Sequence, residues 1–111
     1  VATVGHAFAR EIMFTARQFD AAEAAAMGLV NRVVAAADLA ATVQQLAATI
    51  AQNAPLTMRA AKRAINTAIE DESRRNLAAV DAAVAACFAS EDYAEGRRAF
   101  IEKRKPQFRG R

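Results

Sequence analysis

Long alanine-rich segments dominate this sequence, and very few residues in it would interrupt a helix. Hydrophobic residues make up 54% of the 111 positions, against only four glycines and two prolines. Alanine loses no side-chain entropy on entering a helix, whereas glycine and proline both destabilise one. The length suits one modest domain. We therefore expect a mainly α fold of five or six helices with one short strand.

Start and stop signals divide the apolar periodicity into segments. Asp20 and Glu23 have the spacing of a capping box, and Gly28 can end the short helix that follows them. Pro55 closes one helix and suits the first turn of the next. Helices are expected at residues 4–14, 20–28, 38–54, 55–70, about 72–88 and 92–105.

Leu29–Val34 is the one β-like run, because it is rich in β-branched residues. An isolated strand is marginal in water. This segment therefore either pairs with residues outside the chain or forms an extended connection.

The C-terminal stretch, residues 90–111, has the clearest charge pattern. Asp92 is a suitable N-cap with Glu95 completing a capping box, and Pro106 stops the helix. Acids gather at the start and bases at the end, which favours the helix dipole at both ends. An apolar stripe is expected to dock this helix and leave its cationic end free; it comprises Tyr93, Ala94, Phe100 and Ile101.

The positive charge of the chain belongs to this stretch. It holds seven basic and four acidic residues, a net of +3, which equals the net charge of the whole chain. Nucleic acid, acidic lipid and a phosphorylated small molecule are the partners that a cationic cluster could bind, and solvated surface charge is the alternative. Aromatic residues are only 6% and form no stacking pattern, so we expect no nucleic-acid partner.

No catalytic constellation is visible. The sequence contains no HExxH, CxxC, GxGxxG, GxxxxGK or GxSxG motif. His6 is expected to be solvated or packed, and Cys87 to be a buried structural thiol. Glu11, beside Arg10, is expected to form a surface or interface salt bridge. We expect no catalytic residue and no metal in this chain. A lone cysteine and the lack of a ~20-residue apolar run favour a cytoplasmic protein without a membrane partner.

Several stretches together resemble the C-terminal part of the enoyl-CoA hydratase/isomerase, or crotonase, family. The order and spacing carry the resemblance more than any single motif. Its landmarks are Gly5, Ala9, Glu11, Phe14, Thr15, Glu23, Ala24, Gly28, Leu29, Val30, Asn31, Pro55, Lys62, Ser90, Asp92, Glu95, Gly96, Ala99, Phe100, Glu102, Lys103, Arg104, Pro106 and Phe108. Three positions depart from the family pattern: Ala16 replaces a common glycine, Ala35 a common proline, and Val84 an aromatic residue that helps to enclose adenine in some hydratases.

The resemblance implies the C-terminal helical part of the crotonase-like α/β spiral fold, as a single fragment over residues 1–111. Residues 1–36 would end the core, and 37–111 would form the trimerisation and CoA-contacting region. The parent would act on acyl-CoA thioesters through an oxyanion-stabilised enolate, with coenzyme A as part of the substrate and no separate cofactor. The oxyanion hole and the acid/base residues would lie upstream, so this chain alone would be inactive. A homo-oligomer, a trimer or a dimer of trimers, is implied, and Lys103 matches a lysine that approaches the CoA phosphate.

A different interpretation is a stand-alone helical module for oligomerisation or binding, without catalysis. A severed domain should expose large apolar patches and self-associate. A basic nucleic-acid-binding protein is the third interpretation, and a steep loss of binding with salt would mark it.

Overall fold

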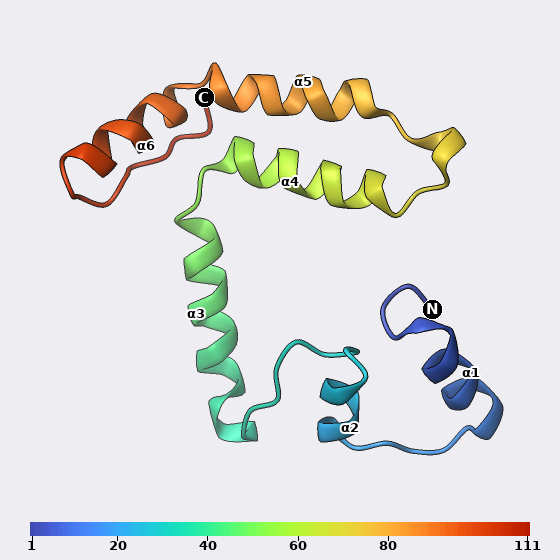
Figure 1. The fold of residues 1–111 in the computed structure, drawn as a ribbon. Helices are drawn as coiled ribbons and strands as arrows, with labels where there is room; N and C mark the ends of the chain where they lie inside the picture. Colours follow the sequence, from blue (N-terminus) through green and yellow to red (C-terminus); the bar gives the residue numbers. More distant parts are fainter. The chain divides into compact units, whose positions relative to one another are not determined.

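The computed structural model describes all 111 residues and consists of helices joined by turns (Figure 1). The elements are α1 Gly5–Thr15, α2 Ala21–Ala26, the 3₁₀ turn η1 Ala36–Asp38, α3 Leu39–Ala51, α4 Pro55–Ala68, the 3₁₀ turn η2 Glu72–Arg74, α5 Leu77–Phe88 and α6 Glu91–Ile101. Two compact units, Val1–Val43 and Gln44–Arg111, divide the chain and are described separately. The mainly α prediction is confirmed, with six α-helices.

The first unit holds α1 and α2. The predicted capping box is present: the Glu23 amide donates to Asp20 Oδ1 at 2.8 Å, and the Asp20 amide donates to Glu23 Oε2 at 3.1 Å. Gly28 ends the helix with a φ of +74°, the left-handed conformation that glycine adopts without steric cost. The Leu29 amide then donates to Ala24 O at 2.9 Å, which completes a Schellman turn.

The predicted short strand is wrong. Leu29–Val34 has no strand partner and forms an irregular connection between α2 and η1. A strand exists only through ladder hydrogen bonds to a neighbour, and no other segment of the chain is extended beside this one. The β-branched composition therefore gives only an irregular connection here.

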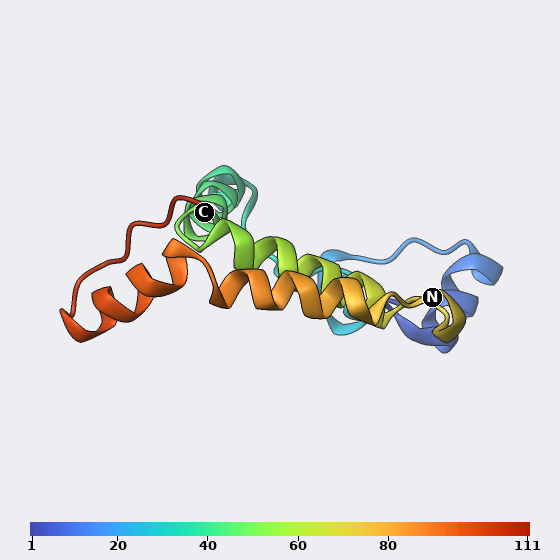
Figure 2. The ribbon, with the colours of Figure 1, turned by 90° about the horizontal axis from the view of Figure 1, so that it is seen from above.

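In the second unit, α4 and α5 run antiparallel and pack along their lengths (Figures 1 and 2). Pro55 occupies the first turn of α4, as predicted. The α4 residues that are covered are small: Ala60 and Thr67 are buried and Ala64 is half-buried. Small side chains at this spacing form one helix face and allow close approach of the partner helix.

The predicted apolar stripe of α4 lies on a different face from this contact. Ile65 and Ile69 are 64% and 75% exposed. The stripe predicted for α3 is also exposed, with Leu39 and Val43 more than half accessible. The helices are thus placed as expected, but their large apolar side chains remain uncovered.

The fifth helix begins later than predicted. Instead of a continuous helix from about Glu72, a 3₁₀ turn at Glu72–Arg74 is followed by α5 from Leu77. Asn76 caps α5, since its side chain accepts from the Ala79 amide at 2.9 Å. The capping asparagine is a signal in the sequence that fixes this start.

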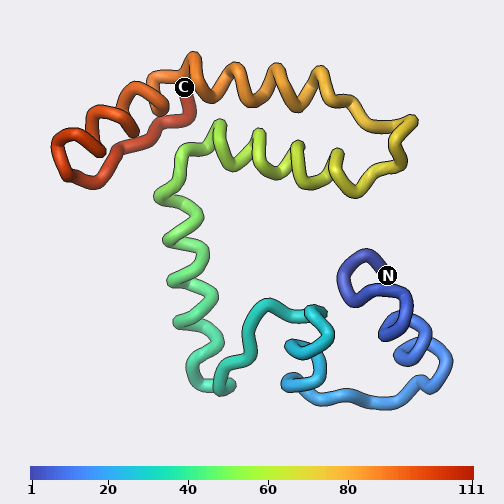
Figure 3. The backbone as a smooth tube through the Cα atoms, viewed as in Figure 1, coloured from blue at the N-terminus to red at the C-terminus, as the bar shows by residue number.

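The sixth helix ends in a reversal of the chain. Residues 104–111, which we call the C-terminal strap, return antiparallel along α6 toward its N-terminus (Figure 3). Two predictions fail here. Ser90, and not Asp92, is the N-cap, with its Oγ accepting from the Tyr93 amide at 3.1 Å. The predicted docking stripe is exposed, with Phe100 at 84%, because the strap contacts α6 at Asp92, Glu95 and Gly96 instead.

Candidate functional site

Lys103 occupies the corner between α6 and the strap. Its backbone is left-handed, with a φ of +53°. The Arg104 amide donates to Ala99 O at 3.0 Å and the Lys103 amide to Phe100 O at 3.3 Å, which is the Schellman pattern around this residue. Glycine is the usual residue at such a position, because a side chain there costs roughly 1–2 kcal/mol. A lysine is therefore held at a backbone position that disfavours it, and its side chain is exposed.

Asp92 anchors the far end of the strap. The residue is only 3% exposed, and its two carboxylate oxygens accept from consecutive strap amides: Arg109 N to Oδ1 at 2.6 Å and Gly110 N to Oδ2 at 2.8 Å. The Asp92 amide also donates to Arg111 O at 3.1 Å. A buried carboxylate requires such partners, and hydrogen bonds to an ionised acceptor are about twice as strong as neutral ones.

Glu95 anchors the near end. Its carboxylate receives both terminal nitrogens of Arg104, at 2.6 and 2.9 Å, and the Gln107 amide at 2.9 Å. The Arg104 hydrogen bonds, and then that of Gln107, lower the pKa of Glu95 from 4.5 to about 2. The same carboxylate and that of Glu102 raise the pKa of Arg104. The acids that were predicted to form a capping box thus fasten the strap instead.

Two glycines let the strap lie close to the helices. A Cβ on Gly96 would lie 3.5 Å from the Phe108 ring, so the ring packs directly over this helical glycine. A Cβ on Gly110 would lie 3.4 Å from the Pro55 ring, and Gly110 has a φ of +77°. The strap therefore contacts both α6 and the start of α4, and its path is fixed over its whole length.

Most cations of residues 90–111 are left without an ion pair. Arg104 pairs with Glu95 and Glu102, and Arg111 pairs with Glu91. The cations outside any ion pair are Arg97, Arg98, Lys103, Lys105 and Arg109.

A polar groove of about 540 Å³ lies between α6 and the strap. Three of the unpaired cations, Arg98, Lys105 and Arg109, line it, while Lys103 does not. The sequence singled out Lys103 as the one candidate binding residue. The structure shows three further unpaired cations in the groove beside the strap, which the sequence did not indicate as a group.

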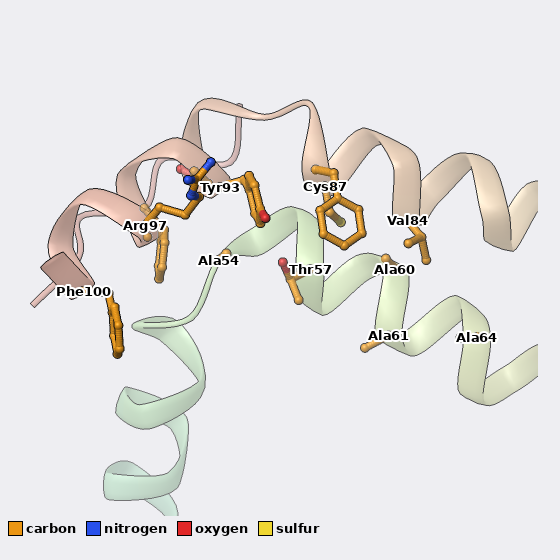
Figure 4. A pocket seen from close by; sticks show the side chains of 14 residues that line it. Ala54, Thr57, Ala60, Ala61, Ala64, Val84, Cys87, Tyr93, Arg97 and Phe100 are labelled. Atoms are coloured by element: carbon orange, nitrogen blue, oxygen red, sulfur yellow. The ribbon is translucent and has the colours of Figure 1, made fainter.

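An apolar cavity of about 620 Å³ lies between α4, α5 and α6 (Figure 4). Thr57 and Ala60 of α4 face Val84 and Cys87 of α5 across it. Cys87 is half-buried, and therefore less buried than predicted. Its thiol donates to Ala83 O at 3.2 Å. Val84, one of the three departures from the family pattern, lines this cavity.

The remaining sequence candidates lie outside the C-terminal strap. His6 is exposed. Glu11 pairs with Arg17 at 2.8 Å and not with Arg10, and the Arg17 guanidinium also reaches Glu23 at 2.9 Å, which ties α1 to α2. No group of three or more His, Cys, Asp or Glu side chains is placed to hold a metal. No helix is long and apolar enough to cross a membrane.

The C-terminal unit thus combines a fastened cationic corner with exposed apolar side chains. A family model described as enoyl-CoA hydratase/isomerase matches residues 1–111. The chain is 44% identical over 105 residues to a "probable enoyl-CoA hydratase" of Mycobacterium bovis and 39% identical over 102 residues to the short-chain-enoyl-CoA hydratase of Clostridium acetobutylicum. The chain belongs to the enoyl-CoA hydratase/isomerase family.

The similarity extends to structure but covers only part of each relative. The crystal structure of an enoyl-CoA hydratase from Bacillus anthracis matches with a TM-score of 0.90 and 34% identity, over 99% of this chain and 43% of that one. The two curated relatives are matched over 95% and 92% of this chain, but over 41% and 39% of their own lengths. The chain therefore spans about two fifths of the relatives that it matches.

Proposed function

We propose that this chain is the binding and assembly region of an enzyme that acts on acyl-CoA thioesters through an oxyanion-stabilised enolate. Residues 1–36 would end the catalytic core, and residues 37–111 would form the trimerisation and CoA-contacting region. The carrying observation is the family match over all 111 residues, combined with coverage of only about two fifths of the relatives. The oxyanion hole and the proton-transferring acids would come from other residues, so the chain by itself would be inactive.

Lys103 is our candidate contact to the adenosine phosphate end of coenzyme A. Its side chain is exposed, forms no ion pair and projects from a fixed corner. An ammonium group binds phosphate by charge and hydrogen bonding. Placement at a backbone position that disfavours lysine supports a role for the side chain itself, since such outliers persist mainly where function uses them.

The exposed apolar helix faces support assembly of the protein into a homo-oligomer, a trimer or a dimer of trimers. Burying one Phe or Ile side chain contributes about 1.5–3 kcal/mol. Large side chains at least 60% exposed are Ile65, Ile69, Leu77, Phe88, Phe100 and Ile101 in the second unit alone. Trimerisation would cover such side chains without any additional partner. We place the protein in the cytoplasm, as its single cysteine indicates.

The test uses the protein expressed from its native gene, so that all residues that accompany this chain in the cell are present. We expect it to hydrate or isomerise a short-chain enoyl-CoA, and the 111-residue chain to show neither activity. Lys103→Asn should raise the KM for the CoA substrate about fivefold with kcat unchanged, because about 1 kcal/mol of substrate binding is lost. Asparagine tolerates the left-handed backbone, so the substitution removes only the charge.

Arg63→Gln is the matched control, because Arg63 is an exposed cation on α4 without an ion pair. It should leave the KM unchanged. An unchanged KM for Lys103→Asn would remove Lys103 from the CoA site, and absence of both activities would contradict the proposed enzyme class.

A stand-alone helical module without catalysis is the second candidate, and the same exposed apolar faces favour it. The mass of the native gene product separates the two. A product of the 11.9 kDa of this chain that forms stable oligomers supports the module. A product more than twice that mass, active on enoyl-CoA, supports the enzyme.

A further inference from the structure

The C-terminal strap is fastened to α6 at two separate points, and Lys103 lies at the bend that both points hold. Glu95 holds Arg104 and Gln107 beside the bend. Asp92 holds Arg109 and Gly110 one helical turn further back. The hydrogen bonds follow one antiparallel order along helix and strap, so the returning segment cannot shift along α6 without breaking all of them.

Asp92 is the least exposed charged residue of the chain and forms no ion pair. Its carboxylate is satisfied by two backbone amides 17 and 18 residues away. Surface charge for solubility would not need burial, and a helix cap would not reach across to the strap. The arrangement is that of a fastener, which converts a flexible terminus into a fixed one.

The bend itself is strained, which makes the fastener necessary. A lysine with a φ of +53° relaxes to the right-handed or extended region when nothing holds it. With the strap released, the Lys103 corner would open and its ammonium group would no longer have a fixed position. The Schellman hydrogen bonds alone join only residues 99–104, next to the bend.

We propose that Asp92 is a positioning residue: by binding the Arg109 and Gly110 amides it holds the strap, and thereby fixes the Lys103 corner for recognition of a phosphate group. The inference rests on the proposed contact between Lys103 and the CoA phosphate. Asp92 touches no phosphate, and it carries a negative charge of its own.

That negative charge gives the test a sign. By charge alone, removing a carboxylate near a phosphate site strengthens anion binding, because a repulsive Coulomb interaction disappears. Release of the strap predicts the opposite. Asp92→Asn should therefore weaken binding of CoA about fivefold, as Lys103→Asn does, and should abolish the preference for CoA over 3′-dephospho-CoA. A merely structural defect would weaken both ligands equally.

Binding is measured by calorimetry on the protein expressed from its native gene. Asp81→Asn is the charge control, because Asp81 is an exposed α5 carboxylate without a hydrogen bond, and it should leave both affinities unchanged. Gly110→Pro releases the strap from its other side, because proline lacks the amide that donates to Asp92 Oδ2 and also excludes the φ of +77° that Gly110 adopts. The double variant should lose no more than either single variant, since both break the same fastening.

Limited trypsin digestion reports the strap without any ligand. Cleavage after Arg104 and Arg109 should be faster in Asp92→Asn than in the unsubstituted protein. If the protein prefers CoA over 3′-dephospho-CoA and Asp92→Asn keeps that preference, the positioning role is overturned while the Lys103 contact stands. If the protein shows no such preference, the Lys103 contact fails and the positioning role fails with it, whereas faster digestion would still verify the fastening.

Discussion

Replacing Lys103 by glycine should stabilise the end of α6 while it weakens CoA binding. A left-handed backbone costs an ordinary residue roughly 1–2 kcal/mol, and glycine avoids this cost. Glycine also gains about 0.4–1 kcal/mol of conformational freedom in the unfolded chain, which opposes the benefit. The difference leaves a net stabilisation of about 1 kcal/mol. The stabilisation is expected at the Lys103 corner itself, because the φ of +53° and the two Schellman hydrogen bonds are found there.

Amide hydrogen exchange measures this gain where it arises. The amides of residues 103 and 104 are closed by bonds to Phe100 O and Ala99 O, so their exchange requires opening of the corner. A stabilisation of about 1 kcal/mol slows that exchange about fivefold. Lys103→Ala is the control, because alanine removes the ammonium group but keeps the strained backbone, and it should not slow exchange. Equal protection in the glycine and alanine variants would mean that the corner stores no strain, and the argument for a functional lysine at this position would lose its physical basis.

Three further predictions concern the same fold. The pKa of Glu95 is lowered to about 2 in the folded chain, so unfolding takes up a proton and the strap loses stability as the pH falls from about 4.5 toward 2. Digestion of the strap by pepsin measures this loss, and Glu95→Gln should remove its pH dependence. Ala16 ends α1 with a φ of +48°, so Ala16→Gly should stabilise this turn by about 1 kcal/mol. The amide of residue 16, which donates to Ile12 O, should then exchange more slowly, and unchanged exchange would show that the turn is unstrained. Gly96→Ala should stabilise the chain by about 0.5–1 kcal/mol and raise the midpoint of thermal unfolding, because the new Cβ meets Phe108 at an ordinary 3.5 Å. Gly96→Leu should lower the midpoint by displacing the ring, and the opposite order would refute the packing.

Local signals in the sequence predicted the parts of the fold that depend on neighbouring residues. The capping box of Asp20 and Glu23, the left-handed Gly28 and the first-turn Pro55 are all confirmed. Each depends on residues within one or two turns, where spacing determines contact. Ala16 was identified differently, by the family resemblance, as a replacement for a common glycine, and the structure places it in a left-handed turn.

Contacts between distant residues could not be predicted in this way. Asp92 has the side chain of an N-cap, and only the position of Gly110, 18 residues later, reveals its other role. Ser90 and Asp92 lie two residues apart, and either side chain could cap the helix. Ser90 is the N-cap in the structure, because the Asp92 carboxylate accepts from the strap amides instead. The helix stripes fail for a related reason, since small residues such as Ala60 mediate the α4–α5 contact, while the large apolar residues remain exposed.

The acids and bases of residues 90–111 have different tasks, and the net charge of +3 conceals this. All four acids bind residues of the strap: Glu91, Asp92, Glu95 and Glu102 are each engaged by its side chains or amides. Five of the seven bases form no ion pair. The negative charges, with Arg104 and Arg111, therefore serve the internal structure, and the other five positive charges are left unpaired. Solvated solubility charge would need no such division, whereas recognition of a phosphate requires cations that are held in place and left unpaired.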